Sequence, residues 1–484
     1  MMGRLYAVCL FFLTLVSLIA SPSSSAQGAS SLDGTFVNMY AVTACPTPTA
    51  ASCYLTNSAQ ASSAVAALTQ GGARYFMMPA AIWNSSYDWP SELSQLQTLA
   101  SAIDAQGGKF LVSEKWDWTG DCSSFTQQTI DGVLLPLEQK FPNSFYGLQF
   151  PDEPTQADLG SLQQLKTCIK QQPALAGLKI FLNLVPLNAN SVALTGTGPG
   201  VAGALSPSDY GVDCGTNSIT NASLVSSMVN NYTSYVLTAI SDISPDYLSF
   251  DFYPITQLYD NCTAARDLIM SDNMSIIASQ SLRYGITPIT YLQNAKLAPL
   301  SPDTSGDSLE YANFNLLRWY SSWFFAFGGN GFANFVSNDT VDSNGSPLYE
   351  GMLSSDNTPG PLASDEQSTY GMNQQVQNAL AGYPFQDFVA PFLDVTTGST
   401  IGWLPSNQVI AGEYGAPSSG TVMLFFASRP TSPWTPVTIG LNQWWTTIEQ
   451  LNFATGTWQV VGNSTNAITI NFGEFPGALY RLKH

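Results

Sequence analysis

The sequence predicts an α/β fold: a (β/α)8 TIM barrel followed by a small antiparallel β-sandwich domain. In residues 27–382, short apolar runs typical of strands alternate with segments whose apolar residues recur at helical spacing. In residues 383–484 that spacing disappears, and short apolar runs are separated by Gly, Pro or Asn. An open doubly wound sheet is the alternative for the first region. It is disfavoured because no predicted strand is followed by the Gly-rich turn that such folds use for phosphate.

Eight strand-like and eight helix-like segments alternate in the first region. A helix that connects two strands returns the chain to the same end of the sheet, so the strands are expected to pair in parallel. The predicted strands are residues 34–40, 74–78, 109–113, 144–150, 178–185, 246–252, 288–292 and 331–336. The predicted helices are residues 58–68, 91–106, 125–140, 158–171, 224–243, 264–284, 309–327 and 366–380.

The second region, residues 383–484, has about the length of one small sandwich of antiparallel strands. Its predicted strands are residues 421–427, 437–441, 446–452, 457–461, 468–472 and 478–482. We expect this domain to pack on the flank of the barrel.

Residues 1–26 are typical of a signal peptide. Arg4 supplies the positive charge, residues 5–20 the apolar core, and Ser24, Ser25 and Ala26 a small-residue cleavage site. A signal anchor is the alternative. No later run is long and apolar enough to span a bilayer. We therefore expect a secreted, extracellular protein, either free or associated with the cell wall.

The charges exclude several classes of function. Lys and Arg number 15 and Asp and Glu 34, which gives a net charge of −19 and makes nucleic acid an unsuitable partner. The single histidine is the last residue, His484, which excludes Ser-His-Asp triads and His-ligated zinc. Carboxylates and tyrosines remain for acid–base chemistry, and we expect neither a metal site nor a cofactor. The oligomeric state is left open.

Cleavage of the leader removes Cys9 and leaves six cysteines, an even number that indicates disulfides in an exported chain. Six cysteines allow fifteen pairings. We favour Cys45–Cys53, Cys122–Cys168 and Cys214–Cys262.

Eight N-x-S/T sequons indicate a eukaryotic secretory glycoprotein. They lie at Asn84, Asn221, Asn231, Asn261, Asn273, Asn338, Asn344 and Asn463.

The stretch 144–154, SFYGLQFPDEP, ends a predicted strand with two adjacent acids, Asp152 and Glu153. Pro151 cannot donate to a sheet ladder, so the strand must stop there and the acids follow its C-terminal end. In a βα barrel, that end of the strands is where catalytic groups project. An acidic turn with no chemistry is the alternative.

Other polar and aromatic residues follow the remaining predicted strands. Carboxylates and amides can bond sugar hydroxyls, indole rings stack on the apolar face of a pyranose, and glycosidic cleavage needs two carboxyl groups. This combination predicts a carbohydrate site. The candidates are Glu114, Trp116 and Trp118 after the third strand, Asn183 on the fifth, Asp251 and Tyr253 after the sixth, Gln293 after the seventh and Asn334 on the eighth.

The motifs GLQFPDEP, YLSFDFYP and FANF, in a barrel followed by a small β domain, resemble those of clan A glycoside hydrolases. The family 42 β-galactosidases are among the distant relatives by this resemblance, which covers most of the mature chain in layout but is specific only at the motifs. It implies that Glu153 is the general acid/base. The clan usually has Asn before that glutamate, and this chain has Asp152. The clan's nucleophile is a glutamate after strand seven, where this chain reads ITYLQNAK with Gln293.

We therefore expect a secreted glycoside hydrolase that cleaves O-glycosidic bonds of a neutral poly- or oligosaccharide. Glu153 would donate the proton, and Asp251 or Glu114 would serve as base or nucleophile. Asp152 would orient Glu153 or bind a hydroxyl, with Tyr253, Gln293, Asn183, Trp116, Trp118 and Asn334 as further substrate ligands. Two alternatives remain: a catalytically inactive carbohydrate-binding barrel of the cell wall or extracellular matrix, and a structural coat protein.

Overall fold

The computed structural model describes most of the chain. The described residues are 32, 34–39, 57–78, 89–113, 122–198, 200–293, 296–297, 314–329, 331–335, 337–341, 347–354, 357–393, 395–404, 409–428, 436–472 and 476–484. Within these ranges, no helix combines the length and the apolar character that crossing a bilayer would require.

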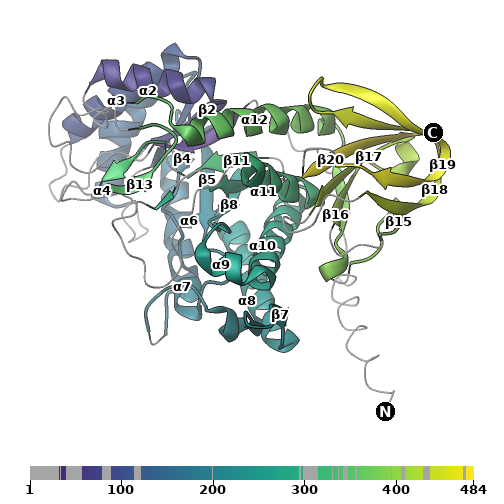
Figure 1. Cartoon of the computed structure of the whole chain (residues 1–484). Coiled ribbons are helices and arrows are strands. Elements are labelled where there is room, and N and C mark those ends of the chain that lie inside the picture. The colour runs from purple at the N-terminus through teal and green to yellow at the C-terminus, as the bar shows by residue number, and fades with distance from the viewer. Residues whose placement is uncertain are drawn as a thin grey trace.

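The predicted barrel is confirmed (Figure 1). Eight parallel strands close into a ring in the order β1-β11-β9-β8-β5-β4-β3-β2, so the first and eighth strands pair. Each lies within or beside the segment that the sequence predicted. The strands are β1 (Thr35–Asn38), β2 (Ala73–Met78), β3 (Lys109–Ser113), β4 (Phe145–Gln149), β5 (Lys179–Leu184), β8 (Tyr247–Phe250), β9 (Thr287–Leu292) and β11 (Gly331–Asn334).

Helices surround this ring, and the eight predicted helical segments are all present. Capping side chains fix several starts: Asn57 accepts from the backbone N–H of Ala59, and Thr155 and Asp158 form a capping box. The helices are α2 (Ser58–Gln70), α3 (Trp89–Ala105), α4 (Ser124–Thr129) continued through a π-turn into α5 (Leu135–Lys140), α6 (Gln156–Lys170), α8 (Ala222–Ile243), α10 (Thr263–Arg283), α11 (Phe314–Ala326) and α12 (Pro361–Leu380).

Strand alternation divides the barrel's side chains between two cores. On β5, Ile180, Leu182 and Leu184 belong to the core beneath the helices, whereas Phe181 belongs to the core inside the ring. Neighbouring side chains of a strand point to opposite faces. Asn183 therefore points into the ring, and β5 is the strand on which the site depends.

The C-terminal region is the predicted antiparallel β domain. Its seven strands hydrogen-bond into one continuous sheet in the order β14-β16-β17-β20-β18-β15, with β19 paired to β18, and the sheet folds around its own apolar core. Residues 437–441 and 446–452 form one long strand rather than two. The strands are β14 (Phe385–Val389), β15 (Ile401–Trp403), β16 (Val409–Tyr414), β17 (Thr421–Ser428), β18 (Val437–Asn452), β19 (Thr457–Ile470) and β20 (Gly477–Lys483).

This domain packs on α11, beside the barrel (Figure 1). Trp323 of α11 donates its indole N–H to the Ser428 carbonyl at 2.9 Å, and the rings of Phe325 and Phe425 lie 5.4 Å apart. A Cβ at Gly412 of β16 would lie 2.6 Å from the Ala326 carbonyl oxygen, so glycine is required for this close approach. The expected packing of the domain on the barrel's flank is confirmed.

Two of the three expected disulfides are formed, Cys122–Cys168 and Cys214–Cys262. Cys45 and Cys53 lie outside the described residues.

Candidate active site

The site lies at the C-terminal ends of β4, β5 and β8, which are neighbours in the ring. Asp152 and Glu153 follow β4, Asn183 lies on β5, and Asp251 follows β8 directly. Backbone bonds extend the ladder beyond the strands: the Glu153 N–H donates to the Asn183 carbonyl and the Asp251 N–H to the Leu184 carbonyl, both at 3.2 Å. Residues 152 and 251, far apart in sequence, are thereby held on either side of β5.

The Asn183 side chain joins the two aspartates. Its Nδ2 donates to Asp152 Oδ1 at 2.8 Å and to Asp251 Oδ2 at 2.7 Å, while its Oδ1 accepts from the Ser249 hydroxyl at 2.6 Å. Asn183 and Ser249 are both fully buried. Because both carboxylate oxygens accept from the same nitrogen, the distance between these oxygens cannot exceed the sum of the two hydrogen-bond lengths. These three bonds occupy the Asn183 side chain, which was predicted to be a substrate ligand, in joining the two aspartates.

Asp251 has a second donor, because the Tyr253 hydroxyl lies 3.1 Å from its Oδ1. Burial nevertheless raises the pKa of Asp251 well above its ordinary value, and the charges of Asp152 and Glu153 raise it further. The bonds from Asn183 and Tyr253 oppose this rise because they favour the anion. Asp251 therefore faces into the cluster, as its predicted role requires.

Glu153 has an unusual backbone for a non-glycine residue, with φ of 50° in the left-handed region. Such strain, between Pro151 and Pro154, is found where the surrounding structure holds a residue in place. The pKa of Glu153 is raised to about 7, first by burial and then by the charge of Asp152. No described residue is hydrogen-bonded to its carboxyl group.

Asp152 completes the cluster. Burial raises the pKa of its carboxyl, and the bond from Asn183 lowers it in part. By surface area Asp152 and Glu153 are open to water, yet protein atoms surround both closely enough to oppose ionisation. Burial raises the pKa values of all three carboxyl groups, and the charge of Asp152 raises those of Glu153 and Asp251 further, which opposes simultaneous ionisation of the three acids.

Tyrosines border the three acids. The ring of Tyr253 lies 5.0 Å from that of Phe335. On α8, Tyr235 donates to the Pro154 carbonyl, and Tyr232, one turn earlier, has a buried hydroxyl with no partner among the described residues. Sequence reasoning missed Ser249 and these two tyrosines. Of these three, only Ser249 could have been predicted from the sequence. It lies two residues before Asp251, and residues two apart on a strand share one face.

Gln293 and Asn334, two of the expected substrate ligands, have other roles. Gln293 is 1 % exposed, and its amide accepts from the Ile255 N–H at 2.8 Å and donates to the Ile255 carbonyl at 2.6 Å. Through these two bonds, Gln293 holds the backbone of the segment that follows β8. Asn334 follows inward-facing Ala333, so it points to the helix layer, where it is fully buried and donates to the Thr35 hydroxyl at 3.4 Å. The structure does not bring Asn334 into the cluster.

The remaining candidates, Glu114, Trp116 and Trp118, lie outside the described residues. Among the residues that the structure does describe, no group of three or more His, Cys, Asp or Glu side chains is arranged to hold a metal ion.

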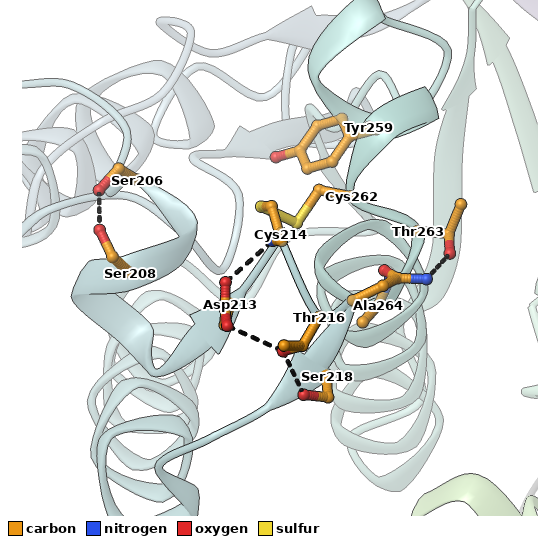
Figure 2. The surroundings of a disulfide bond; sticks show 12 residues. Ser206, Ser208, Asp213, Cys214, Thr216, Ser218, Tyr259, Cys262, Thr263 and Ala264 are labelled. Carbon is orange, nitrogen blue, oxygen red and sulfur yellow. Dashed lines mark hydrogen bonds between the residues drawn. A yellow bond between two sulfur atoms is a disulfide. The ribbon is translucent and has the colours of Figure 1, made fainter.

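The long segment between β5 and α8 is held in place by a disulfide bond (Figure 2). The Cys214–Cys262 disulfide joins it to the start of α10. Asn217 strengthens this link, because its Nδ2 donates to the Thr263 hydroxyl and its Oδ1 accepts from the Ala264 N–H, both at 2.7 Å. The second bond satisfies a free N–H in the first turn of α10. This loop is thus a fixed part of the barrel's C-terminal end.

A cavity of about 590 Å³ opens at the opposite end of the barrel. Tyr146, Lys179, Tyr247 and Thr287, at the starts of four strands, contribute to its lining. Lys179 pairs with Asp246 there at 2.8 Å. Asp246 is the one carboxylate in the lining of this cavity, and it is paired, so the cavity lacks the two free carboxyl groups that the predicted cleavage needs.

Two of the predicted glycosylation sites are buried in the folded protein. Asn273 is fully buried and accepts from the Leu187 N–H at 2.9 Å, and Asn338 is 1 % exposed and donates to Asn357 Oδ1 at 2.8 Å. A glycan has no room at either amide. Asn84 and Asn344 lie outside the described residues, and the exposed sequons are Asn221, Asn231, Asn261 and Asn463.

Comparison with known proteins supports the architecture. No family model and no curated protein matches the sequence. The solved structures that are similar over nearly the whole chain include two with TM-scores of 0.50 or more. One, a glycoside hydrolase, has a TM-score of 0.51 at 9 % identity and covers 93 % of this chain and 92 % of its own. The other, a glycoside hydrolase family 5 protein from Bacteroides vulgatus, has a TM-score of 0.50 at 9 % identity and covers 93 % of this chain and 89 % of its own. At this identity, the likeness shows that the chain shares their barrel fold.

Proposed function

We propose that this protein is a secreted glycoside hydrolase that cleaves O-glycosidic bonds of a neutral poly- or oligosaccharide. The observation that carries the proposal is the gathering of Asp152, Glu153 and Asp251 at the C-terminal end of the barrel, where one acid has a pKa of about 7 and an unbonded carboxyl group. Glycosidic cleavage needs one protonated and one ionised carboxyl group. The similarity in fold to two glycoside hydrolases supports the substrate class.

The hydrogen-bond donors distinguish the roles of the acids. Asn183 donates to Asp152 and Asp251 and opposes part of the rise that burial causes in their pKa values, whereas no described donor reaches the Glu153 carboxyl. Glu153 therefore retains its proton up to about neutral pH and gives it to the leaving oxygen. Asp251, held by Asn183 and Tyr253, acts as base or nucleophile toward the anomeric carbon in its ionised form, which these two bonds favour and which burial and the neighbouring acids oppose. Asp152 holds the Asn183 amide in place and raises the pKa of Glu153.

The second carboxyl group is the point at which this site differs from clan A enzymes. Their nucleophile follows the seventh strand, where this chain has the buried Gln293. Here the second acid follows the sixth strand, β8. The mechanism that we propose therefore does not use the nucleophile position of the clan. The relation to family 42 β-galactosidases stays a prediction.

That same glutamine favours one competing function, a barrel that binds carbohydrate without cleaving it. Glu153→Gln distinguishes the two, because the amide cannot donate the proton but keeps the shape of the side chain. Wild-type protein, Glu153→Gln and Asp251→Asn would be assayed against soluble and insoluble neutral glycans, with the exposed Asp260→Asn on α9 (Gln257–Asn261) as control.

Under the proposal, the wild type and Asp260→Asn release reducing sugar. Glu153→Gln and Asp251→Asn lose activity by about 10²–10⁴-fold while still binding the glycan. A wild type that binds a glycan but releases no sugar would identify the inactive binding protein instead.

A further inference from the structure

Two tryptophans of the C-terminal sheet leave most of their side chains in water. Trp403 on β15 is 59 % exposed and Trp444 on β18 is 65 % exposed, whereas Trp319, Trp323 and Trp445 are buried. Leaving an indole in water forgoes the free energy of its burial. Two such rings on hydrogen-bonded strands therefore form a rigid apolar surface that a ligand can cover.

Both rings lie on the same outer face of the sheet. On β18, Ile439, Leu441 and Trp445 point into the domain's core, so residues 440, 442 and 444 point outward. Trp403 lies opposite Gly440, and a register shift between Ile401 and Trp403 turns its ring away from the core. Trp403 of β15 lies opposite Gly440, and Trp444 follows Gly440 by four residues on β18, within a stretch where the register against β19 shifts. The two rings therefore lie at different places along the strand direction.

The sheet surface next to Trp403 carries only small residues, Gly440 and Ala467, and we call it the floor of the face. Gly440 lies opposite exposed Ala467 of β19. A Cβ placed on Gly440 would meet no described atom within 4 Å except Trp403 Cβ, at 3.9 Å. The strip next to the indole is therefore open to a flat molecule that stacks on the ring.

The chemistry of this face indicates a neutral ligand that carries hydroxyl groups. Residues 401–403, 437–444 and 463–470 contain no charged residue, in a chain whose net charge is −19. The hydroxyls of Thr438 and Thr469 lie 3.0 Å apart on the exposed surface. The Asn442 side chain precedes Trp444 on β18, and its NH2 group donates to the Gly398 and Ser399 carbonyls, so that its carbonyl oxygen is the group left for a ligand. Hydroxyls and amides next to flat rings suit the polar edges and apolar faces of pyranoses.

We propose that the Trp403–Trp444 face, made of Trp403, Gly440, Asn442, Trp444 and Ala467, binds a neutral polysaccharide chain. One sugar ring stacks on Trp403 above Gly440, and a ring farther along the chain stacks on Trp444. This site is separate from the carboxylates and goes beyond the proposed hydrolysis, since it would hold the protein on a polymer whether or not the barrel cleaves it.

Binding isotherms of the full chain on insoluble cellulose, β-1,3-glucan, mannan and chitin test the proposal. The variants are the double replacement Trp403→Ala/Trp444→Ala and Gly440→Gln, which fills the floor and leaves both indoles in place. Gly440 has no positive φ, so a side chain is tolerated there. Val460→Ser on β19, which alters an apolar side chain that is 56 % exposed elsewhere on the sheet, is the control.

The wild type and Val460→Ser are expected to bind at least one of the four polymers with equal Kd. The double variant and Gly440→Gln should bind it about tenfold more weakly, because each stacked ring contributes about 0.5–1.5 kcal/mol. The proposal is overturned if the wild type binds none of the polymers, or if both altered proteins bind like the wild type. It is also overturned if the wild type is a dimer that the double variant disrupts, since a second copy would then cover the face.

Failure here is distinguishable from failure of the proposed hydrolysis. The double variant should cleave soluble aryl glycosides at the wild-type rate, because its changes lie outside the barrel. Glu153→Gln should keep the affinity for the insoluble polymer and lose cleavage.

Discussion

Asn183 Nδ2 lies 2.7 Å from Asp251 Oδ2 and, through its other hydrogen, 2.8 Å from Asp152 Oδ1. One buried amide thus connects the acid after β4 with the acid after β8. Ser249 accounts for the direction of this amide, because its hydroxyl donates to Asn183 Oδ1 and leaves the NH2 group for the two carboxylates.

Replacement of Asn183 by Asp should disable the site. The change substitutes a fourth acid for the shared donor, so both aspartates lose a bond that favours their anions and gain a like charge. We expect kcat to fall by about 10²-fold or more and the pKa on the acidic limb of the pH–rate profile to rise. Steady-state rates across pH check both.

Ser249→Ala should have a smaller effect than Asn183→Asp. It frees the Asn183 side chain to rotate without adding charge, so we expect kcat to fall by about tenfold and the pKa of the acidic limb to shift less. Equal effects of Ser249→Ala and Asn183→Asp would contradict the role given to the shared donor.

The pH dependence of cleavage should follow Glu153. Its pKa of about 7 implies that the proton donor is present below that pH and lost above it. We expect kcat/KM to fall tenfold per unit above about pH 7. A profile that is flat from pH 6 to pH 9 would exclude Glu153 as the acid.

Folding stability should decrease from acidic to alkaline pH. Burial raises the pKa of Glu366 to about 8 and that of Asp272 to about 7. A carboxyl with a raised folded pKa stabilises the fold below its ordinary unfolded value, and this contribution is lost as pH rises through the folded value. The window for Glu366 therefore runs from about pH 4.5 to about pH 8. Thermal unfolding should give a higher Tm at pH 4.5 than at pH 8.

Glu366→Gln isolates one of these groups. The residue is fully buried on α12, so its ionisation costs about 1.4 kcal/mol per unit of pKa shift. The variant should resemble the wild type at pH 4.5 and be more stable than it by a few kcal/mol at pH 8. A loss of stability at pH 8 would show that the carboxylate is compensated in the folded protein.

Glycan occupancy tests the burial of two sequons. Asn273 and Asn338 hold backbone or side-chain partners inside the fold, and we expect both to be unmodified in secreted protein. The exposed Asn221, Asn231, Asn261 and Asn463 are the available acceptors among the described sequons. Peptide mass spectrometry after glycosidase treatment in labelled water measures each site. A glycan on Asn273 would be incompatible with this structure.

The barrel was predictable because its local signals agree with one another. Apolar runs that end at Pro151 or continue into FDFYP, separated by amphipathic helices, leave few other folds. The location of Glu153 and Asp251 at one end of the barrel was predictable for the same reason, since each follows a strand. In the C-terminal domain, β14, β15 and β16 were missed because short runs interrupted by Gly and Pro lack a clear period.

The face of a strand on which a side chain lies and the contacts between distant segments could not be predicted from the sequence. Asn334 was expected at the C-terminal end of the barrel with its side chain near the site. Which face of β11 it occupies depends on the strand's alternation, and a strand of four residues is too short for the sequence pattern to decide this. Gln293 is at the expected end of its strand, yet the Ile255 backbone occupies its amide. The bridging role of Asn183 depends on β4 and β8 being the neighbours of β5, which only the closed ring establishes.

The most direct test of Glu153 as proton donor is the cleavage of two aryl glycosides of the preferred sugar by Glu153→Gln. A dinitrophenyl group leaves without protonation, whereas a phenyl or sugar leaving group needs the acid. We predict that the variant loses about 10²–10⁴-fold on the poor leaving group and retains most of the wild-type rate on the dinitrophenyl glycoside. Equal losses on both substrates, or no loss on either, would contradict the assignment.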